Sequence, residues 1–339
     1  MSNPRKVTTM ADIARLADVH VSTVSRALNG SPLVEKSMRE RILAIADKHG
    51  FVVNSAARNL RAGRTQTLSV VIPLAHERGQ DLTDPFFAYM LSHLADEITR
   101  RGYGMHLQKV LAPTQGWLQK LHAERRADGI IVIGQSTEHA AFQQAADLGL
   151  PFVVWGGHVP RQRYCVVGSD NVNAARIATE HLLKLGRRRI VFVGDPAIPE
   201  IRLRCDGYEE ALKKASIRGA AIVKAHMTPE AAYASMLGHI RKGKPFDAVF
   251  AATDIIAISA MRALAASGLS VPGDVAVVGL DGIEMGAHVH PALTTVRQDL
   301  ARGAELLVDL LLKRIAGEAV QPVIMAGELI VRESCGARR

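Results

Sequence analysis

A short segment near the amino terminus carries the side chains that point most clearly to a chemistry, which is the reading of DNA bases. Val21, Ser22 and Arg26 are spaced to fall on one face of a helix running from Val21 to about Asn29. Arginine can donate two hydrogen bonds to a guanine edge, serine can bond several bases, and valine can contact only apolar groups such as the thymine methyl. The spacing therefore predicts a helix that enters the major groove.

Other polar side chains near this helix suit contacts with DNA phosphates, which position a protein without carrying sequence information. We predict this role for Thr9, His20 and Ser25, and Asn29 lies on the same polar face. Residues 1–66 hold 11 Lys and Arg against 5 Asp and Glu, a net +6 of the chain's +9. Positive charge concentrated in one small segment is typical of a module that binds a polyanion.

Three helices must position these side chains. Apolar residues recur at helical spacing over Met10–Ala17, Val21–Asn29 and about Glu35–His49, with Thr9 as N-cap of the first helix and Gly50 at the end of the third. Two short helices, a tight turn and a third packing helix make a helix-turn-helix. A small helical bundle that binds no DNA is the alternative. The basic surplus in the same segment favours DNA binding.

The segment Asn54–Ala62 is a candidate hinge. Asn54 is a good N-cap and helix formers follow it, yet nine residues are fewer than the roughly 12–15 that an isolated helix needs. We expect it to be helical only when docked. Leu60, an apolar residue between basic ones, suits a wedge between base steps in the minor groove. The alternative is a plain linker.

From Leu68 onward, apolar runs typical of buried strands alternate with helical stretches, which predicts parallel sheets covered on both faces. The expected strands are Leu68–Ile72, Met105–Gln108, Gly129–Ile133, Phe152–Trp155, Cys165–Val167, Ile190–Val193, Ala248–Ala251 and Val275–Gly279. The expected helices include Phe86–Arg101, Ala174–Leu185, Gly207–Ala215, Ala231–Arg241, Ile255–Ser267 and Leu300–Ala316. This length of chain is sufficient for two doubly wound α/β lobes.

In such sheets ligands bind beyond the carboxyl ends of the strands, and the residues found there suit a polyol. Carboxylates and an arginine can share hydrogen bonds with vicinal hydroxyls, and an aromatic ring can cover the apolar face of a pyranose. The candidate ligand-binding residues are Asp84, Phe86, Phe87, Trp155, Asp170, Arg204, Thr253, Asp254, Asp281 and Gln298. For Asp170 and Asp254 helix capping is an alternative role, and for Trp155 packing in the core.

Several classes of protein lack support in the sequence. No GxGxxG opens a helix after the first strand, and Walker A, GxSxG and HExxH motifs are missing, so we expect no catalysis and no cofactor. The HVHP segment at 288–291 is interpreted as a turn rather than a metal site. We expect neither a membrane span nor a signal peptide, and the odd number of three scattered cysteines favours a reducing cytoplasm.

Residues 9–65 closely resemble the DNA-binding headpiece of the lactose-repressor (LacI) family. The similarity is most specific in the core DIA…V…STVSRALN and in the following NSAARNL. By position Val21, Ser22 and Arg26 match the family's base-reading residues, and Leu60 matches its hinge leucine. Asp18 and Val53 depart from the family pattern, which usually has Gly or Asn and Pro there.

The resemblance continues to the end of the chain, in HLLKLGRRRIVFVGDP, RLRCDGYEEAL, DAVFAATDIIAISAMRALAASGLSVPGDVAVVGLDG and HPALTTVRQDLARGAELLVDLLLKRI. Arg187 stands where the family usually has His. The resemblance implies a periplasmic-binding-protein-like core of two lobes joined by three crossovers. The implied domains are an all-α headpiece of 1–53, a hinge and linker of 54–66, one lobe of 67–186 plus 299–325, and another of 187–298 plus 326–339.

The resemblance also implies a function. Residues matching effector-contacting positions of the family are Phe87, Met227, Arg204, Thr253 and Asp281. The chain is then expected to be a regulator, in the usual case a repressor, that binds a pseudo-palindromic operator as a homodimer. A small-molecule effector, best matched by a mono- or disaccharide, would control it. A sugar-binding transport protein would share the lobes but would carry a signal peptide and no basic headpiece.

A purine effector is the alternative within the family. The family's purine binder has aromatic residues at the positions of Phe86 and Phe87, and Arg204 also matches it. Met227, however, replaces the aromatic residue that would complete the stacking of a base. Trp155 and the acidic residues fit a sugar better.

Overall fold

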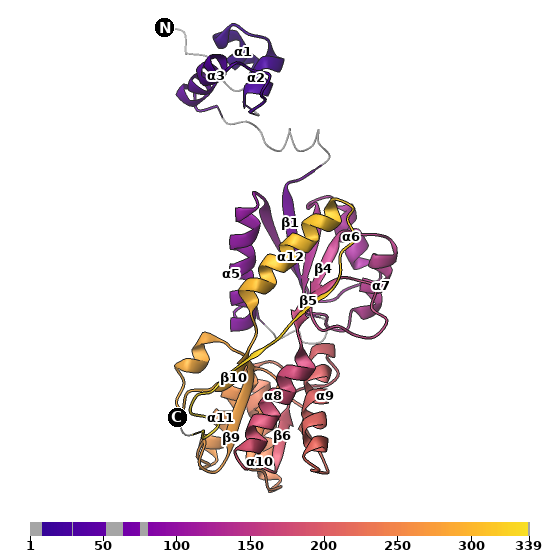
Figure 1. The fold of residues 1–339 in the computed structure, drawn as a ribbon, viewed down its shortest axis with the longest axis vertical. Helices are drawn as coiled ribbons and strands as arrows, with labels where there is room; N and C mark the ends of the chain where they lie inside the picture. The colour runs from indigo at the N-terminus through magenta and orange to yellow at the C-terminus, as the bar shows by residue number, and fades with distance from the viewer. Residues whose placement is uncertain (1–8, 29, 52–63, 75–80, 338–339) are drawn as a thin grey trace. The chain divides into compact units, whose positions relative to one another are not determined.

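The computed structural model describes residues 9–28, 30–51, 64–74 and 81–337. The chain divides into two compact units, Met1–Thr65 and Gln66–Arg339. Figure 1 shows the helices of the first unit and, in the second, helices packed around sheets. No helix within the described ranges is long and apolar enough to cross a membrane.

The first unit contains the three predicted helices, α1 (Met10–Ala17), α2 (Val21–Leu28) and α3 (Lys36–Lys48). Thr9 caps α1 as predicted: its hydroxyl accepts the N–H of Asp12, and the Asp12 carboxylate accepts the N–H of Thr9. This reciprocal pair satisfies two amides that the first turn leaves without a helical partner. The helix then ends at Asp18, whose φ of 49° lies in the left-handed region that Asp tolerates.

The three helices pack around a small apolar core. Ile13, Val24 and Ile42, one from each helix, are fully buried. After α3, Gly50 has a φ of 58°, and the N–H of Phe51 donates to the carbonyl of Ala46 at 2.8 Å. This closing turn returns Phe51 to the core. The bundle buries one face of α2 and leaves the other to solvent.

In the described part of the second unit the strands form two sheets of six strands each. The first sheet has the order β11-β5-β4-β3-β1-β2, from β1 (Thr67–Pro73), β2 (Gly104–Val110), β3 (Gly129–Ile133), β4 (Phe152–Trp155), β5 (Val166–Ser169) and β11 (Val323–Met325). The second has the order β12-β10-β9-β8-β6-β7, from β6 (Ile190–Val193), β7 (Ala221–Val223), β8 (Ala248–Ala251), β9 (Ala276–Asp281), β10 (Thr294–Arg297) and β12 (Glu328–Ile330). The pairing is parallel except between β10 and β12.

Helices cover both faces of the sheets, as the continuous apolar strands predict. On β1, Val70 and Val71 are both fully buried but belong to different apolar clusters, because successive side chains point to opposite faces. The helices of the first lobe are α5 (Pro85–Arg100), α6 (Trp117–Ala123), α7 (His139–Asp147) and α12 (Leu300–Ile315). Those of the second lobe are α8 (Asn171–Lys184), α9 (Pro199–Lys214), α10 (Pro229–Arg241), α11 (Asp254–Ala266) and the short 3₁₀ helix η1 (Glu284–Ala287).

The chain crosses between the lobes three times, after β5, after β10 and between β11 and β12. The expected boundary at 186 places α8 in the wrong lobe. Ala174, Ala178 and Leu182 of α8 are buried in the apolar cluster of the second sheet, so the first crossover lies near Asp170. The helical pattern indicates which face of α8 is apolar but not which sheet it covers.

Helix α9 begins earlier than predicted. The sequence places its start at Gly207, but it runs from Pro199 with Gly207 in its middle. A Cβ at Gly207 would lie 2.1 Å from the carbonyl oxygen of Val172, so glycine is required there by close packing against α8. Helices α6 and α7 and strands β7, β10, β11 and β12 were also absent from the predicted elements.

Replacing Gly207 should therefore destabilise the core. In Gly207→Ala the added methyl meets backbone, which cannot move aside as a flexible side chain would, so we expect a loss of about 1–3 kcal/mol in the free energy of unfolding. Gly238→Ala is the matched control, because a Cβ at Gly238, in α10, would meet no atom within 4 Å, and there alanine should stabilise by a few tenths to about 1 kcal/mol. Urea unfolding of both variants measures the difference, and equal effects would contradict the packing argument.

Candidate functional site

The solvent-facing side of α2 carries the predicted base-reading residues. Val21, Ser22 and Arg26 are all exposed, and Val21 keeps 40% of its surface accessible although it is apolar. Val24 and Ala27, on the opposite side, are buried in the headpiece core. An exposed valine beside a serine and an arginine is the surface that a helix needs to contact base edges.

His20 and Ser22 contact each other at the amino end of α2. The Ser22 hydroxyl lies 2.8 Å from His20 Nδ1, and the Ser22 N–H donates to the same nitrogen at 3.3 Å. When Nδ1 accepts these bonds, the imidazole carries its proton on Nε2, which is then a donor of the kind that phosphates accept. Both side chains are exposed, so the pair can meet a DNA backbone.

The other predicted DNA contacts differ in how far the structure describes them. Thr9 is exposed but already serves as a helix cap, so a phosphate would share its hydroxyl with Asp12. Ser25 is half-buried on α2. Asn29, Asn54 and Leu60 lie outside the described residues, and their roles stay predictions.

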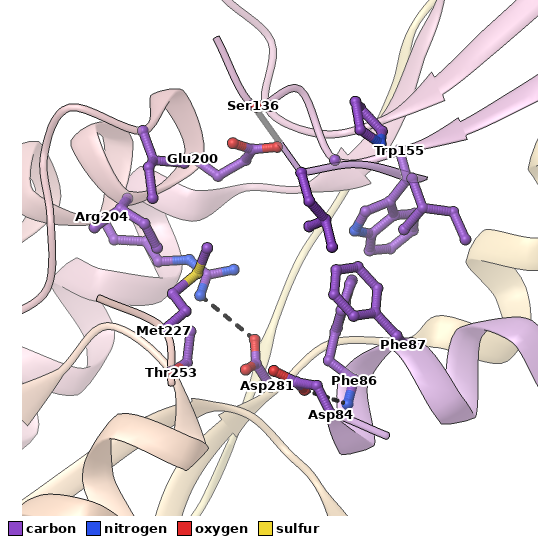
Figure 2. A pocket seen from close by; sticks show the side chains of 16 residues that line it. Asp84, Phe86, Phe87, Ser136, Trp155, Glu200, Arg204, Met227, Thr253 and Asp281 are labelled. Carbon is purple, nitrogen blue, oxygen red and sulfur yellow. Dashed lines mark hydrogen bonds and ion pairs between the residues drawn. The ribbon is translucent and has the colours of Figure 1, made fainter. Parts of the chain in front are cut away.

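A cavity lies between the two lobes of the core. It is lined by residues at the carboxyl ends of strands in both sheets, the location predicted from the strand pattern. Eight of the eleven expected effector-binding residues line it: Asp84, Phe86, Phe87, Trp155, Arg204, Met227, Thr253 and Asp281. Figure 2 shows their side chains converging from elements that are far apart in the sequence.

The first lobe supplies an aromatic wall. Phe86 packs 5.5 Å from Phe87 in an edge-to-face arrangement and 6.4 Å from Trp155, measured between ring centroids. Trp155 is 5% exposed and packs so closely on α12 that a Cβ at Gly303 would lie 2.3 Å from its ring. Trp155 therefore packs in the core, as considered for it, and also reaches the cavity wall (Figure 2), while its contact with a ligand stays a prediction.

The second lobe supplies a polar wall centred on Arg204, which is 6% exposed. Its Nε donates to Asn171 Oδ1 at 2.8 Å, and its Nη1 donates to the Ala252 carbonyl at 2.5 Å and to Asp281 Oδ1 at 3.4 Å. Arg204 lies in the second turn of α9. The guanidinium is thus held rigidly toward the cavity.

Asp281 ends β9 and faces this guanidinium across the polar wall (Figure 2). Burial raises its pKa to about 7, against the opposing effect of Arg204, and the nearby carboxylates of Asp254 and Asp84 raise it further. Gln298 Nε2 donates to Asp281 Oδ1 at 2.7 Å. Gln298 was predicted to contact the ligand, but it does not line the cavity. It orients Asp281, which does.

Two predicted ligand contacts are structural instead. Asp254 is fully buried, accepts the N–H groups of Gly282 and Ile283 at 2.8 and 2.9 Å, and accepts the hydroxyl of Thr295 at 2.6 Å. Asp170 caps α8 by accepting the N–H of Asn173 at 3.0 Å. Neither lines the cavity. Helix capping, the alternative considered for both, is observed for Asp170, whereas α11 is capped by Thr253 and Asp254 binds segments distant in sequence.

The prediction missed two polar lining residues, Ser136 and Glu200. Glu200 follows Pro199 in the first turn of α9, and its Oε1 accepts the N–H of Gln135 at 2.8 Å. Gln135 follows β3, so this hydrogen bond joins the two lobes beside the cavity. Burial raises the pKa of Glu200. Proline at the first position of a helix was the signal that could have placed Glu200 at this edge.

Metal binding and disulfide formation are two further kinds of chemistry that the described residues could carry. Within the described ranges no group of three His, Cys, Asp or Glu residues is placed to hold a metal ion. The HVHP segment forms turns and bends, as predicted. The cysteines Cys165, Cys205 and Cys335 are buried and unpaired with one another.

Comparison with known proteins agrees with the division of the chain into a headpiece and a two-lobed core. Residues 9–54 match bacterial regulatory proteins of the lacI family, and residues 179–335 match the periplasmic binding protein-like domain. The HTH-type transcriptional regulator CelR of Thermobifida fusca is 33% identical over 344 residues, which cover 97% of this chain and 99% of CelR.

Solved structures show the same architecture. A complex of the transcriptional regulator CelR with cellobiose is 31% identical, covers 96% of this chain and 99% of its own, and superposes with a TM-score of 0.71. A lac repressor dimer bound to operator and the anti-inducer ONPF is 24% identical, covers 97% of this chain and 99% of its own, and has a TM-score of 0.86. The latter shows a shared fold.

The raised pKa of Asp281 predicts how pH affects the core. A carboxyl with a folded pKa near 7 and an unfolded pKa near 3.8 adds stability below about pH 4 that is lost as pH rises toward 7. The Asn side chain of Asp281→Asn does not ionise, so the variant lacks this loss of stability. Between pH 4 and 7 the free energy of unfolding of the variant, relative to that of the unaltered protein, should therefore rise by up to about 1.4 kcal/mol per pH unit. Urea unfolding across that range measures the gain.

Asp274→Asn is the control for this measurement. Hydrogen bonds from Ser270 hold the pKa of Asp274 below its ordinary value. The contribution of Asp274 to the free energy of unfolding therefore changes with pH only in more acidic solution. The difference between this variant and the unaltered protein should stay constant from pH 5 to 7. A constant difference for Asp281→Asn as well would show that Asp281 ionises freely in the folded state.

Proposed function

The chain belongs to the lacI family of bacterial regulatory proteins, a family of transcription regulators, and we propose that a sugar bound between its lobes controls its binding to operator DNA. The cavity is the observation that carries this proposal. It combines an aromatic wall from one lobe with a polar wall from the other, so an occupant contacts both lobes at once. A ligand that bridges two lobes can favour one angle between them over another.

The chemistry of the two walls fits a sugar. Phe86 and Trp155 can cover the apolar face of a pyranose, while Arg204, Thr253 and Asp281 can bond its hydroxyls. The relative solved with cellobiose has an overall identity of 31% with this chain, which supports a carbohydrate. A purine is the second candidate, favoured by the aromatic pair Phe86 and Phe87. Met227 stands opposite this pair instead of an aromatic residue, and the carboxylates suit hydroxyl donors better.

Coupling to DNA would pass through the start of the first lobe. The N–H of Gln66 donates to Asp128 Oδ2 at 2.9 Å, which fixes the point where the linker joins β1. A change of lobe angle would move this point in each copy of a homodimer. The two headpieces would then fit a pseudo-palindromic operator less well or better, with a coupling of about 1–3 kcal/mol. We further propose that the protein is a cytoplasmic repressor and that the sugar acts as an inducer, which weakens its binding to the operator.

Arg26 offers a test of DNA reading. Arg26→Ala should weaken binding to an operator selected from random duplex DNA by about 1–3 kcal/mol, because a bidentate contact to guanine is lost. Arg26→Lys keeps the charge but not the planar fork, so it should lose specificity while keeping its affinity for unrelated DNA. Fluorescence anisotropy on both DNAs measures this. Equal losses on operator and unrelated DNA would show that Arg26 contacts phosphates rather than bases.

The effector can be tested by ligand-induced thermal shifts. Mono- and disaccharides should raise the unfolding temperature of the full chain, since a ligand that binds only the folded state stabilises it. Asp281→Asn, in contact with Arg204, should reduce the shift, and Asp274→Asn should not. A shift with guanine or hypoxanthine and with none of the sugars would overturn the sugar assignment in favour of a purine.

A further inference from the structure

Three helices begin at the cavity, and the amino end of a helix is ordinarily a good site for an anion. Helices α5, α9 and α11 start at residues 85, 199 and 254, and each has residues of its first turn or its cap in the cavity lining. The first amides of a helix lack helical partners and carry a partial positive charge, which phosphate and carboxylate groups commonly bind. Which ligands this cavity takes therefore depends on whether these amides are available.

The chain's own side chains already occupy these positions. Asp84 Oδ1 accepts the N–H of Phe86 at 3.0 Å, which caps α5. Glu200 places its carboxylate in the first turn of α9. Prolines at the start of both helices, Pro85 and Pro199, remove one donor from each.

The third helix is capped in the same way. Thr253 Oγ1 accepts the N–H of Ile256 at 3.2 Å, and the carboxylate of Asp254 is buried in the first turn of α11. Side chains therefore cap α5 and α11, and α9 carries the Glu200 carboxylate in its first turn. The carboxylates of Asp84 and Glu200 both line the cavity.

The one basic side chain of the described lining is also engaged. Arg204 donates to Asn171, to the Ala252 carbonyl and to Asp281, so much of its donor capacity is spent inside the protein. Against this single guanidinium the lining places three carboxyl groups, from Asp84, Glu200 and Asp281. Burial already raises the pKa values of Glu200 and Asp281, which shows that this environment disfavours negative charge.

We propose that the cavity selects an uncharged sugar and excludes the phosphorylated or carboxylated form of the same sugar, an inference that rests on the sugar effector proposed above. The oxygens of these carboxyl groups accept hydrogen bonds, and sugar hydroxyls donate them. A phosphate ester adds a charge of about −1.5 to −2 and is itself an acceptor. It would meet carboxylates at the positions where a phosphate-binding cavity presents free amides.

Matched pairs of ligands test the selection directly. Isothermal titration of the full chain would compare glucose with glucose 6-phosphate, ribose with ribose 5-phosphate, and cellobiose with its 6′-phosphate. For the sugar that binds, we expect the phosphorylated partner to bind at least 100-fold more weakly. A phosphorylated sugar that binds as well as its parent, or better, would overturn the proposed selection while leaving a sugar effector in place.

Two substitutions test the physical cause. Asp84→Asn with Glu200→Gln removes two negative charges but keeps an oxygen to accept from Phe86 and from Gln135. In this double variant the preference for the uncharged sugar should fall at least tenfold. The control Glu210→Gln with Glu318→Gln removes the same charge from exposed positions outside the cavity lining and should leave the preference unchanged.

The outcomes separate the two levels of the proposal. An equal fall of the preference in both double variants would assign it to the net charge of the protein, and an unchanged preference in both would assign it to shape; either result overturns the role of the cavity carboxylates. If neither member of any pair binds, while a purine does, the sugar effector itself fails and this selection fails with it.

Discussion

The polar wall of the cavity depends on the hydrogen bonds of one buried group, the guanidinium of Arg204. Its partners come from four separate places in the chain: Asn171 at the first crossover, Ala252 after β8, Asp281 at the end of β9 and, through Asp281, Gln298 at the second crossover. An arginine buried to this degree is stable only where its donors are met and a charge opposes it. The requirement therefore fixes the spacing of the strands around it.

The same network joins the cavity lining to the segments that cross between the lobes. Asn171 and Gln298 lie where the chain passes from one lobe to the other, and both are bonded to groups that line the cavity. On the opposite side, the Glu200 carboxylate is bonded to the backbone of Gln135 in the first lobe. A ligand that rearranges Arg204 or Asp281 thus acts on the crossovers themselves, so no long pathway is needed between the site and the hinge between the lobes.

The headpiece follows a different principle. Its core is small, and its caps, turn and buried apolar residues are all set by contacts within a few residues, as in the Thr9–Asp12 box and the turn at Gly50. The apolar core uses Val24 and Ala27 of α2 and leaves Val21 and Arg26 exposed on the other side. The fold of the headpiece therefore does not depend on burying these two side chains.

The sequence by itself determined the three headpiece helices, the alternation of strands and helices in the core, and seven of the lining residues. These follow from periodicity and from the rule that parallel strands point their carboxyl ends to one edge, which are local or topological constraints. Only the tertiary structure decided that Asp254 is buried under Gly282, that Gly207 lies within a helix, that α8 covers the second sheet, and that Glu200 reaches the cavity. Each of these depends on what a distant segment places opposite the residue, and local spacing holds no information about that partner.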